Sequence, residues 1–316
     1  VKTNEASVMN AIDPSVMADP VTGKWWMHYG SFFGGLYCVE LDPETGLPAE
    51  EGDQGHLTAR RANYQKDNLE APEIIYNPDL KQYYLFVSYD PLMTTYNVRV
   101  GRSDKAEGPF VDFSGVELKD TTNNFPILTA PYRFHNHPGW AGTAHCSVFT
   151  SDEGQYFMAH QGRLSPHNQM MDLHLRQVFF TPDGWPVVSP ERYTGSVSRK
   201  FSAEDMAGEW EVIRIQEPAY ERRLQAGQIL WGEGQLKEEE WNVSHLLSLE
   251  KNGNLGENKG TWELLEAKQL LSLTLEGEII NNLIIFAGHD WENEKETVLF
   301  TGLDSRGRSI WGKRIK

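Results

Sequence analysis

Three stretches of this chain repeat one layout, and the repeat limits the possible folds more than any other feature. The stretches begin at Asp13, Glu70 and His145. Each opens with a polar residue and a short strand pattern, turns through Asp, Pro, Asn or Gly, and returns as an aromatic strand. The starts lie about 57 and 75 residues apart, a spacing typical of arrays of similar units. Because helical periodicity is almost absent, the repeats predict an all-β fold.

A β-propeller accommodates such units best, because it is a radial array of four-stranded sheets, or blades. The first strand of each blade lines a central channel, so the three polar starts should meet at one end of that channel. Residues up to about Thr194 hold roughly three blades, whereas a closed ring needs about four to eight. An open ring would expose sheet edges and an apolar face. We therefore expect further blades before Val1 or on a separate polypeptide.

The pattern changes near residues 196–202. Tryptophan-containing strands then alternate with runs such as Gln269-Leu-Leu-Ser-Leu-Thr-Leu. Short antiparallel strands of this kind predict a small β-barrel. We expect two domains: the C-terminal part of a catalytic propeller over residues 1–200 and an accessory antiparallel barrel over residues 203–316.

Composition excludes several classes of function. The net charge of −16 and the pI of about 5.1 disfavour nucleic acid as a partner. No run of about 18 apolar residues predicts a membrane-spanning helix. The two cysteines, Cys38 and Cys146, lie in apolar strand-like runs, which predicts buried free thiols rather than a zinc site. No basic segment followed by an apolar core precedes the repeats, so no signal peptide is visible.

A pair of carboxylates is the strongest catalytic candidate. Asp13 and Glu70 both open an inner strand, and both precede a Pro-containing turn. Glycoside cleavage needs an acid that protonates the leaving oxygen and a carboxylate that acts on the opposite face of the sugar. A further carboxylate nearby can keep the acid protonated by repulsion. The simpler interpretation is that both residues cap turns, and Glu73 competes with Glu70 for the acid role.

Further polar and aromatic residues fall near the same predicted channel. His145 begins the third repeat and His160 ends its aromatic strand, and two imidazoles there can bind a metal or move protons. A single histidine is more often a satisfied core or surface residue. Arg163 can form a fork with a carboxylate or lie on the surface. Aromatic residues at strand ends either stack on sugar rings or pack within the blades: Phe32, Phe33, Tyr96 and Trp140.

Together these segments resemble the endo-α-1,5-L-arabinanases of glycoside hydrolase family 43, over residues 8–195 or so. The matching segments are Asn10-Ala-Ile-Asp13-Pro, Tyr29-Gly-Ser-Phe, Leu69-Glu70-Ala-Pro, Tyr83-Tyr-Leu-Phe-Val-Ser, Tyr96-Asn-Val-Arg-Val-Gly-Arg-Ser and Ala159-His160-Gln-Gly-Arg. Their order and spacing are more specific than any one of them. The remainder, about 203–316, resembles the barrel appended to the longer bacterial arabinanases.

The resemblance implies a secreted, inverting enzyme with a five-bladed propeller that cuts arabinan or arabino-oligosaccharides. It implies that Glu70 is the general acid, that Asp13 tunes the pKa of that acid, and that His160 lies beside a central calcium ion. It assigns five residues to substrate binding: Ser31, Phe33, Tyr96, His145 and Arg163.

The general base of the family is an aspartate in a His-Asp-Pro-like motif of the first blade, and no such motif precedes Asp13. We therefore expect the first blades, with the base, on an associated N-terminal fragment of the same enzyme.

Three other functions fit parts of the sequence. A carbohydrate-binding propeller without catalysis is favoured if the base is absent. An exo-acting arabinofuranosidase or xylosidase fits the same propeller. A lipocalin-like binding protein is suggested by Gly208-Glu-Trp210, which covers the C-terminal domain alone.

Overall fold

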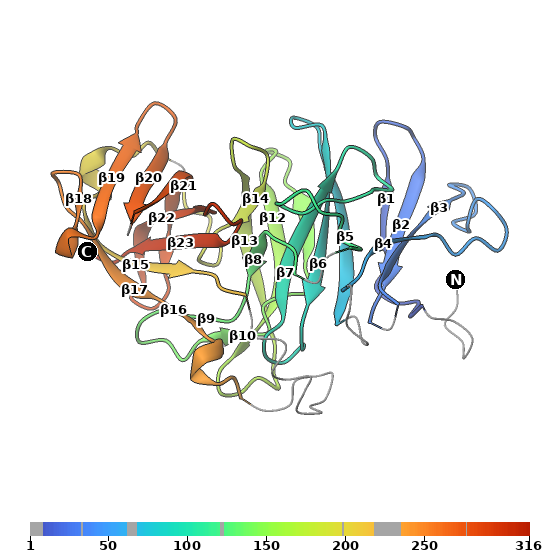
Figure 1. The fold of residues 1–316 in the computed structure, drawn as a ribbon, viewed down its shortest axis with the longest axis horizontal. Coiled ribbons are helices and arrows are strands. Elements are labelled where there is room, and N and C mark those ends of the chain that lie inside the picture. The colour runs from blue at the N-terminus through green and yellow to red at the C-terminus, as the bar shows by residue number, and fades with distance from the viewer. Residues whose placement is uncertain are drawn as a thin grey trace.

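The computed structural model describes residues 9–32, 34–61, 68–120, 123–197, 199–217, 235–275 and 277–316. Strands dominate these residues, so the predicted all-β class is confirmed. The helical elements are short: α1 (Ala203–Met206), η1 (Glu238–Glu240) and η2 (Gly256–Asn258). Three sheets stand side by side in chain order, and a barrel lies beyond the third (Figure 1).

Each of the three sheets contains a four-stranded antiparallel meander, the unit from which propellers are built. The first sheet contains β1 (Ser15–Ala18), β2 (Trp25–Gly30), β3 (Leu36–Leu41) and β4 (His56–Ala59). The second contains β5 (Leu69–Asn77), β6 (Gln82–Tyr89), β7 (Asn97–Ser103) and β8 (Ile127–Thr129). The third contains β11 (Ser147–Thr150), β12 (Tyr156–Leu164), β13 (Asp172–Phe180) and β14 (Pro186–Val188). The expected strand–turn–strand repeats are therefore confirmed.

Backbone geometry corrects the alignment of the repeats by one residue. Asp13, Ala71 and His145 each adopt a left-handed conformation, with φ of 54°, 51° and 54°, directly before an inner strand or within its bulged start. Ala71, not Glu70, is thus the equivalent of Asp13 and His145. Glu70 lies one residue earlier, beside a bulge in the β5–β6 pairing between Glu70 and Glu73. The bulge lets two successive residues of the second repeat approach the same end of the sheets.

A carboxylate ties the inner strands of the three sheets together. Glu73 Oε2 accepts a hydrogen bond from Ser15 Oγ at 2.8 Å, and Glu73 Oε1 accepts one from Ser147 Oγ at 2.8 Å. The backbone N–H of Val148 donates to the same Oε1 at 3.0 Å. Ser15, Glu73 and Ser147 each lie two residues after a left-handed residue. Equivalent positions of the repeat therefore form a lateral hydrogen-bonded belt.

Apolar residues fill the spaces between neighbouring sheets. One core cluster joins the first and second sheets through residues such as Leu36 and Leu85, and another joins the second and third through residues such as Val98 and Met158. Cys38 and Cys146 are buried free thiols within these cores, as expected. Burying these faces against each other supplies the main driving force that holds the meanders side by side.

The expected C-terminal antiparallel barrel is confirmed. Eight strands close it: β15 (Gly208–Arg214), β17 (His245–Leu249), β18 (Asn254–Leu255), β19 (Gly260–Leu265), β20 (Leu270–Leu275), β21 (Glu278–Asp290), β22 (Lys295–Leu303) and β23 (Ser309–Arg314). Its interior is packed with buried apolar side chains that include Trp210, Leu283 and Phe300. The interior of the described barrel is therefore an apolar core.

The barrel shares backbone and core with the third sheet. Strand β16 (Asn242–Val243) pairs in parallel with β9 (Tyr132–Arg133), which joins β10 (Trp140–Ala141) and through it β12. Trp311 of β23 is fully buried in the cluster that joins the second and third sheets. The two parts are therefore one packed body at this interface.

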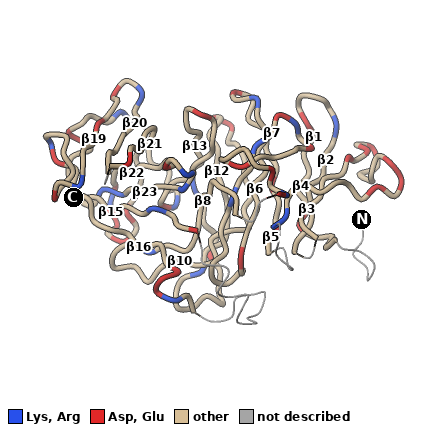
Figure 2. The backbone as a smooth tube through the Cα atoms, viewed as in Figure 1, with Lys and Arg blue, Asp and Glu red and all other residues tan. Residues whose placement is uncertain are grey.

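Acidic and basic residues are interspersed over the sheets and the barrel (Figure 2). Within the described residues, no helix is long and apolar enough to cross a membrane.

Candidate active site

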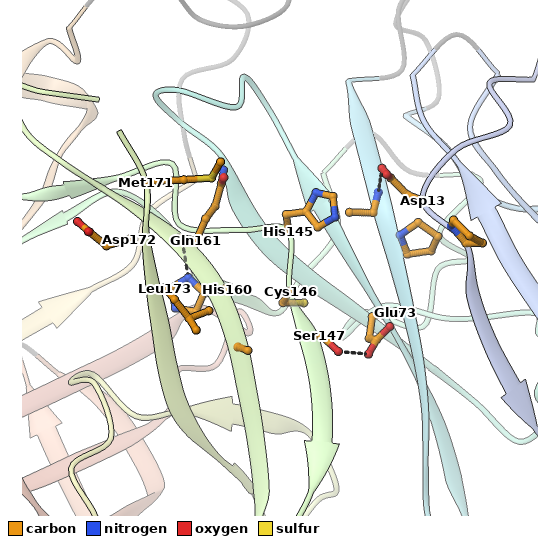
Figure 3. A pocket seen from close by; sticks show the side chains of 14 residues that line it. Asp13, Glu73, His145, Cys146, Ser147, His160, Gln161, Met171, Asp172 and Leu173 are labelled. Atoms are coloured by element: carbon orange, nitrogen blue, oxygen red, sulfur yellow. Dashed lines mark hydrogen bonds between the residues drawn. The ribbon is translucent and has the colours of Figure 1, made fainter. Parts of the chain in front are cut away.

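A cavity of about 540 Å³ opens where the inner strands of the three sheets begin (Figure 3). Each sheet contributes polar side chains to it, and the β12–β13 connection adds an apolar rim. The polar lining includes Asp13, Glu73, His145, His160 and Asp172, and the rim includes Met171 and Leu173. The predicted convergence of the three repeat starts on one pocket is therefore observed for Asp13 and His145, whereas Glu70 is not among the lining residues and precedes the lining residue Ala71.

Glu70 lies directly beside Asp13. The backbone N–H of Ala71, the residue after Glu70, donates to Asp13 Oδ2 at 3.3 Å, and the charge of Asp13 acts on the Glu70 carboxyl group. Burial raises the pKa of Glu70, and the negative charge of Asp13 raises it further. Hydrogen bonds from Tyr96 and Ser31 and the proximity of His145 act in the opposite direction, but burial prevails. A half-buried carboxyl group with a raised pKa has the property that a general acid needs.

Backbone pairing between two sheets fixes where Glu70 sits. Ser31 forms an isolated antiparallel bridge with Glu70 directly after β2 ends, and Phe32 N–H donates to Leu69 C=O at 2.8 Å. Gly30 permits the turn, because its φ is 128° and a Cβ there would lie 2.5 Å from the carbonyl oxygen of Gly35. The first two sheets are therefore joined at the position of the proposed acid.

Tyr96 is held in the same place by a buried ionic network around Asp90, which lies in the β6–β7 loop. Asp90 contacts Arg61 at 2.5 Å and Arg99 at 3.8 Å, and it accepts a hydrogen bond from Asn97 at 2.6 Å. Asp90, Arg61 and Arg99 have no exposed side-chain surface. This network fixes the loop that ends at Tyr96, whose hydroxyl donates to Glu70 Oε1 at 2.5 Å.

Three of the predicted substrate-binding residues are buried, and one of them, Ser31, contacts Glu70. Tyr96 is fully buried and contacts Glu70. Arg163 is also buried, and its guanidinium donates to the backbone carbonyls of Asn168 and Gln169 at 2.8 and 3.3 Å. Arg163 thus forms neither of the two expected arrangements, a carboxylate fork or a surface position. Phe33 lies outside the described residues.

His145 and His160 differ in their exposure and in the groups they contact. His145 is exposed on the pocket wall, and its backbone N–H donates to Ser88 Oγ at 2.8 Å. His160 is buried: Arg176 Nε donates to His160 Nε2 at 2.9 Å, and His160 Nδ1 contacts the carbonyl of Gln161 at 2.7 Å. Burial and the charge of Arg176 lower the pKa of His160 to about 3, so the ring is neutral with its proton on Nδ1.

The predicted calcium site does not fit His160 as a ring-nitrogen ligand. Its Nε2 lone pair already accepts from Arg176, and its Nδ1 carries a proton directed at a carbonyl oxygen. Metal ligation requires a deprotonated, available imidazole nitrogen. Neither nitrogen meets that condition in this arrangement.

One acidic cluster among the described residues is compact enough to hold a cation, but a lysine occupies it. Carboxylate oxygens of Glu191, Asp290 and Glu292 lie within 4.8 Å of one another. Lys313 Nζ contacts Glu191 at 2.9 Å and Asp290 at 3.0 Å, and it also contacts Glu292. The cluster lies where the barrel meets the third sheet, so it joins the two parts of the molecule.

Sequence reasoning missed Ser88 and Arg176, which orient His145 and His160. It also missed Asp172, an exposed acid on the pocket wall. No local motif marks Ser88 or Arg176, because each contacts its histidine through cross-strand or inter-sheet register.

The chain matches two family descriptions and several known proteins. Residues 1–186 match glycosyl hydrolases family 43, and residues 190–312 match the C-terminal lipocalin-like domain of that family. The extracellular endo-alpha-(1->5)-L-arabinanase 2 of Bacillus subtilis is 27% identical over 96% of this chain. The extracellular endo-alpha-(1->5)-L-arabinanase of Thermotoga petrophila is 30% identical over 97% of it. The chain spans 64% of the length of each of these relatives.

Solved structures agree with this likeness. The crystal structure of the endo-1,5-alpha-L-arabinanase from Thermotoga petrophila superposes with a TM-score of 0.81 and 27% identity. The superposition covers 99% of this chain and 69% of that one.

Proposed function

Because the chain belongs to glycosyl hydrolases family 43, we propose that its pocket hydrolyses internal α-1,5 linkages of arabinan with Glu70 as the general acid. The observation that supports this proposal is that Glu70 and Asp13 lie close together where the inner strands of the first and second sheets begin. Relatives with this substrate in their names, and described as extracellular, support arabinan as the substrate and action outside the cell.

In the proposed reaction Glu70 gives its proton to the glycosidic oxygen as the bond to the sugar carbon breaks. The electron pair of that bond passes to the leaving oxygen, which becomes the hydroxyl of one product. Burial, assisted by the charge of Asp13, keeps Glu70 protonated before the step, because two neighbouring carboxylates resist being ionised together. Inversion requires water to attack from the opposite face, activated by a base some 6.5 to 9.5 Å from the acid.

The proposed reaction also needs a base that activates the attacking water. Glu73 is unsuited to this role, because both of its oxygens are engaged in the belt between sheets. The notion that an associated N-terminal fragment carries the base and completes a five-bladed ring stays a prediction. Intact-mass measurement of the purified protein tests it, since a co-purifying fragment of the same enzyme appears as a second species.

The proposed function is tested by Glu70→Gln, which keeps the shape of the side chain and removes its acidity. We expect hydrolysis of linear arabinan to fall by at least about 100-fold, the low end for the loss of a general acid. Glu73→Gln is the matched control, because it alters a nearby carboxylate of the same strand, β5, that has a structural role. Near-normal activity of Glu70→Gln would reject the acid assignment.

The products decide between the related activities. Mixed arabino-oligosaccharides indicate endo cleavage, whereas arabinose alone indicates an exo-acting arabinofuranosidase. Binding of arabinan without any product favours a carbohydrate-binding propeller.

A further inference from the structure

We propose that Tyr96 and Ser31 are positioning residues that hold the Glu70 carboxyl group in the orientation from which it delivers its proton. This inference rests on the proposed function of Glu70. It gives both side chains a role in the reaction without contact to the sugar.

Each carboxylate oxygen of Glu70 has one hydrogen-bond partner among these two residues. Tyr96 Oη donates to Oε1 at 2.5 Å, and Ser31 Oγ lies 3.0 Å from Oε2. The Tyr96 side chain is fully buried and Ser31 is only 2% exposed, so neither side chain is placed to contact a sugar ring in the pocket. Two fixed partners on opposite oxygens leave the carboxyl group little freedom to rotate.

The two hydroxyls differ in what they can do when Glu70 changes its protonation state. Tyr96 remains a donor, because burial and the nearby Glu70 charge raise the pKa of its phenol well above the ordinary value. A serine hydroxyl can rotate and either donate or accept. When Glu70 is protonated, its O–H therefore lies on Oε2 and is accepted by Ser31, while Oε1 continues to accept from Tyr96. This arrangement specifies which oxygen of Glu70 carries the proton.

Proton transfer then follows from these positions. The sugar's glycosidic oxygen replaces Ser31 as the acceptor of the Oε2 proton, the O–H bond of Glu70 breaks, and the leaving oxygen gains the proton. Ser31 turns to donate to the carboxylate that remains. Solvent returns the proton to Glu70 before the next cycle, so the proton count balances over one turnover.

The surroundings of Glu70 determine the expected pH dependence. The titratable groups facing it are Asp13, His145 and Tyr96, and Ser88 bonds to the Tyr96 hydroxyl. Tyr96 donates to Glu70 in both states, and Ser31 bonds more strongly to the charged carboxylate than to the neutral acid, so both hydroxyls favour the carboxylate form, whereas the Asp13 charge disfavours it. Removing either hydroxyl and removing the Asp13 charge should therefore move the titration of Glu70 in opposite directions.

The test is the pH–rate profile of kcat/KM on linear arabinan for Tyr96→Phe, Ser31→Ala and Asp13→Asn. We expect the alkaline limb to move to higher pH in the first two variants and to lower pH in the third. We also expect kcat to fall by roughly 10-fold in Tyr96→Phe with little change in KM, because the hydroxyl acts on the acid rather than on the substrate.

Matched controls separate this role from a general loss of buried hydrogen bonds. Tyr84 is equally buried and donates to the carbonyl of Gly184 at 2.5 Å, and Ser309 is buried and donates to that of Ile127 at 2.6 Å. Tyr84→Phe and Ser309→Ala should leave the alkaline limb in place even where they lower the melting temperature.

The outcomes distinguish this inference from the proposed function. If Tyr96→Phe does not fold, Ser31→Ala provides the test, because it removes a single small hydroxyl group that contacts Glu70. An unmoved alkaline limb in the folded variants would overturn the positioning role while leaving Glu70 as the acid. Near-normal activity of Glu70→Gln would instead overturn the proposed function itself.

Discussion

Lys313→Met is expected to destabilise the protein strongly at alkaline pH and much less at acidic pH. The Lys313 ammonium has no exposed surface, and it contacts Glu191, Asp290 and Glu292 where the barrel meets the third sheet. It also lies 3.9 Å from the centre of the Phe134 ring. Methionine retains most of the apolar stem, so the change mainly removes the charge and its hydrogen bonds.

The expected loss of stability follows from the number of carboxylates that contact the Lys313 ammonium. Each contact near 3 Å is worth about 5 kcal/mol of gross attraction at an effective dielectric constant of roughly 20. Desolvation and repulsion among the carboxylates offset most of it. What remains on removing one partner of a buried charged pair is a loss of about 3–5 kcal/mol. We expect a loss of this size for Lys313→Met at about pH 8.

The sign of the pH dependence comes from the acids that remain. Burial and the neighbouring carboxylate raise the pKa of Glu191 to about 8 despite the attraction of Lys313. A raised pKa in the folded state contributes stability at low pH, and this contribution is lost as the pH rises from about 4.5 to about 8. Although burial opposes it, Lys313 lowers the pKa of Asp290. Without the ammonium both acids protonate more readily, so the defect should shrink at about pH 5.

Urea denaturation at the two pH values measures this effect, with the m value checked for a single transition. Lys295→Met is the matched control, because Lys295 is exposed and donates to the carbonyl of Ile315 at 2.6 Å. That control should stay within about 0.5 kcal/mol of the parent protein. A loss for Lys313→Met that is below about 1 kcal/mol, or equal at both pH values, would refute the reasoning.

Two more variants test the packing of the fold. Glu73→Ala should lower stability by about 1–3 kcal/mol, because it removes the acceptor for Ser15, Ser147 and the Val148 N–H. Thermal melting measures this loss, and an unchanged melting temperature would show that the belt does not stabilise the fold. Trp311→Ala should cost about 3–5 kcal/mol and should destabilise the barrel and the sheets in one transition; two separate calorimetric transitions would show that the shared core is not cooperative.

The strand order and the convergence of Asp13 and His145 on one pocket were predictable, because both depend on the local repeat of polar start, turn and aromatic strand. The barrel was predictable for the same reason, because the alternation of apolar and polar residues that predicts its short strands is a local pattern in the sequence. The resemblance to a known family then predicted Glu70 as the acid, which no periodicity alone could have done.

The contacts between strands were not predictable from one sequence. The bulge that places Glu70 one residue before the equivalent of Asp13 depends on the register of β5 against β6. The bond from Arg176 to His160 depends on the pairing of β12 with β13, in which His160 faces His174. That pairing converts the predicted metal ligand into a buried, neutral hydrogen-bonded ring. Tyr96 was assigned to the substrate for a similar reason, because its sequence neighbours do not reveal that it points at Glu70.

The acid role of Glu70 is tested most directly by changing how much the leaving group needs a proton. The rates of the parent protein and Glu70→Gln are compared on linear arabinan and on an arabino-oligosaccharide with a nitrophenyl leaving group. An alkoxide leaves only after protonation, whereas a nitrophenolate leaves without it. We predict a loss of about 100-fold or more on arabinan and a much smaller loss on the nitrophenyl substrate. Equal losses on both substrates would contradict the assignment of Glu70 as the proton donor.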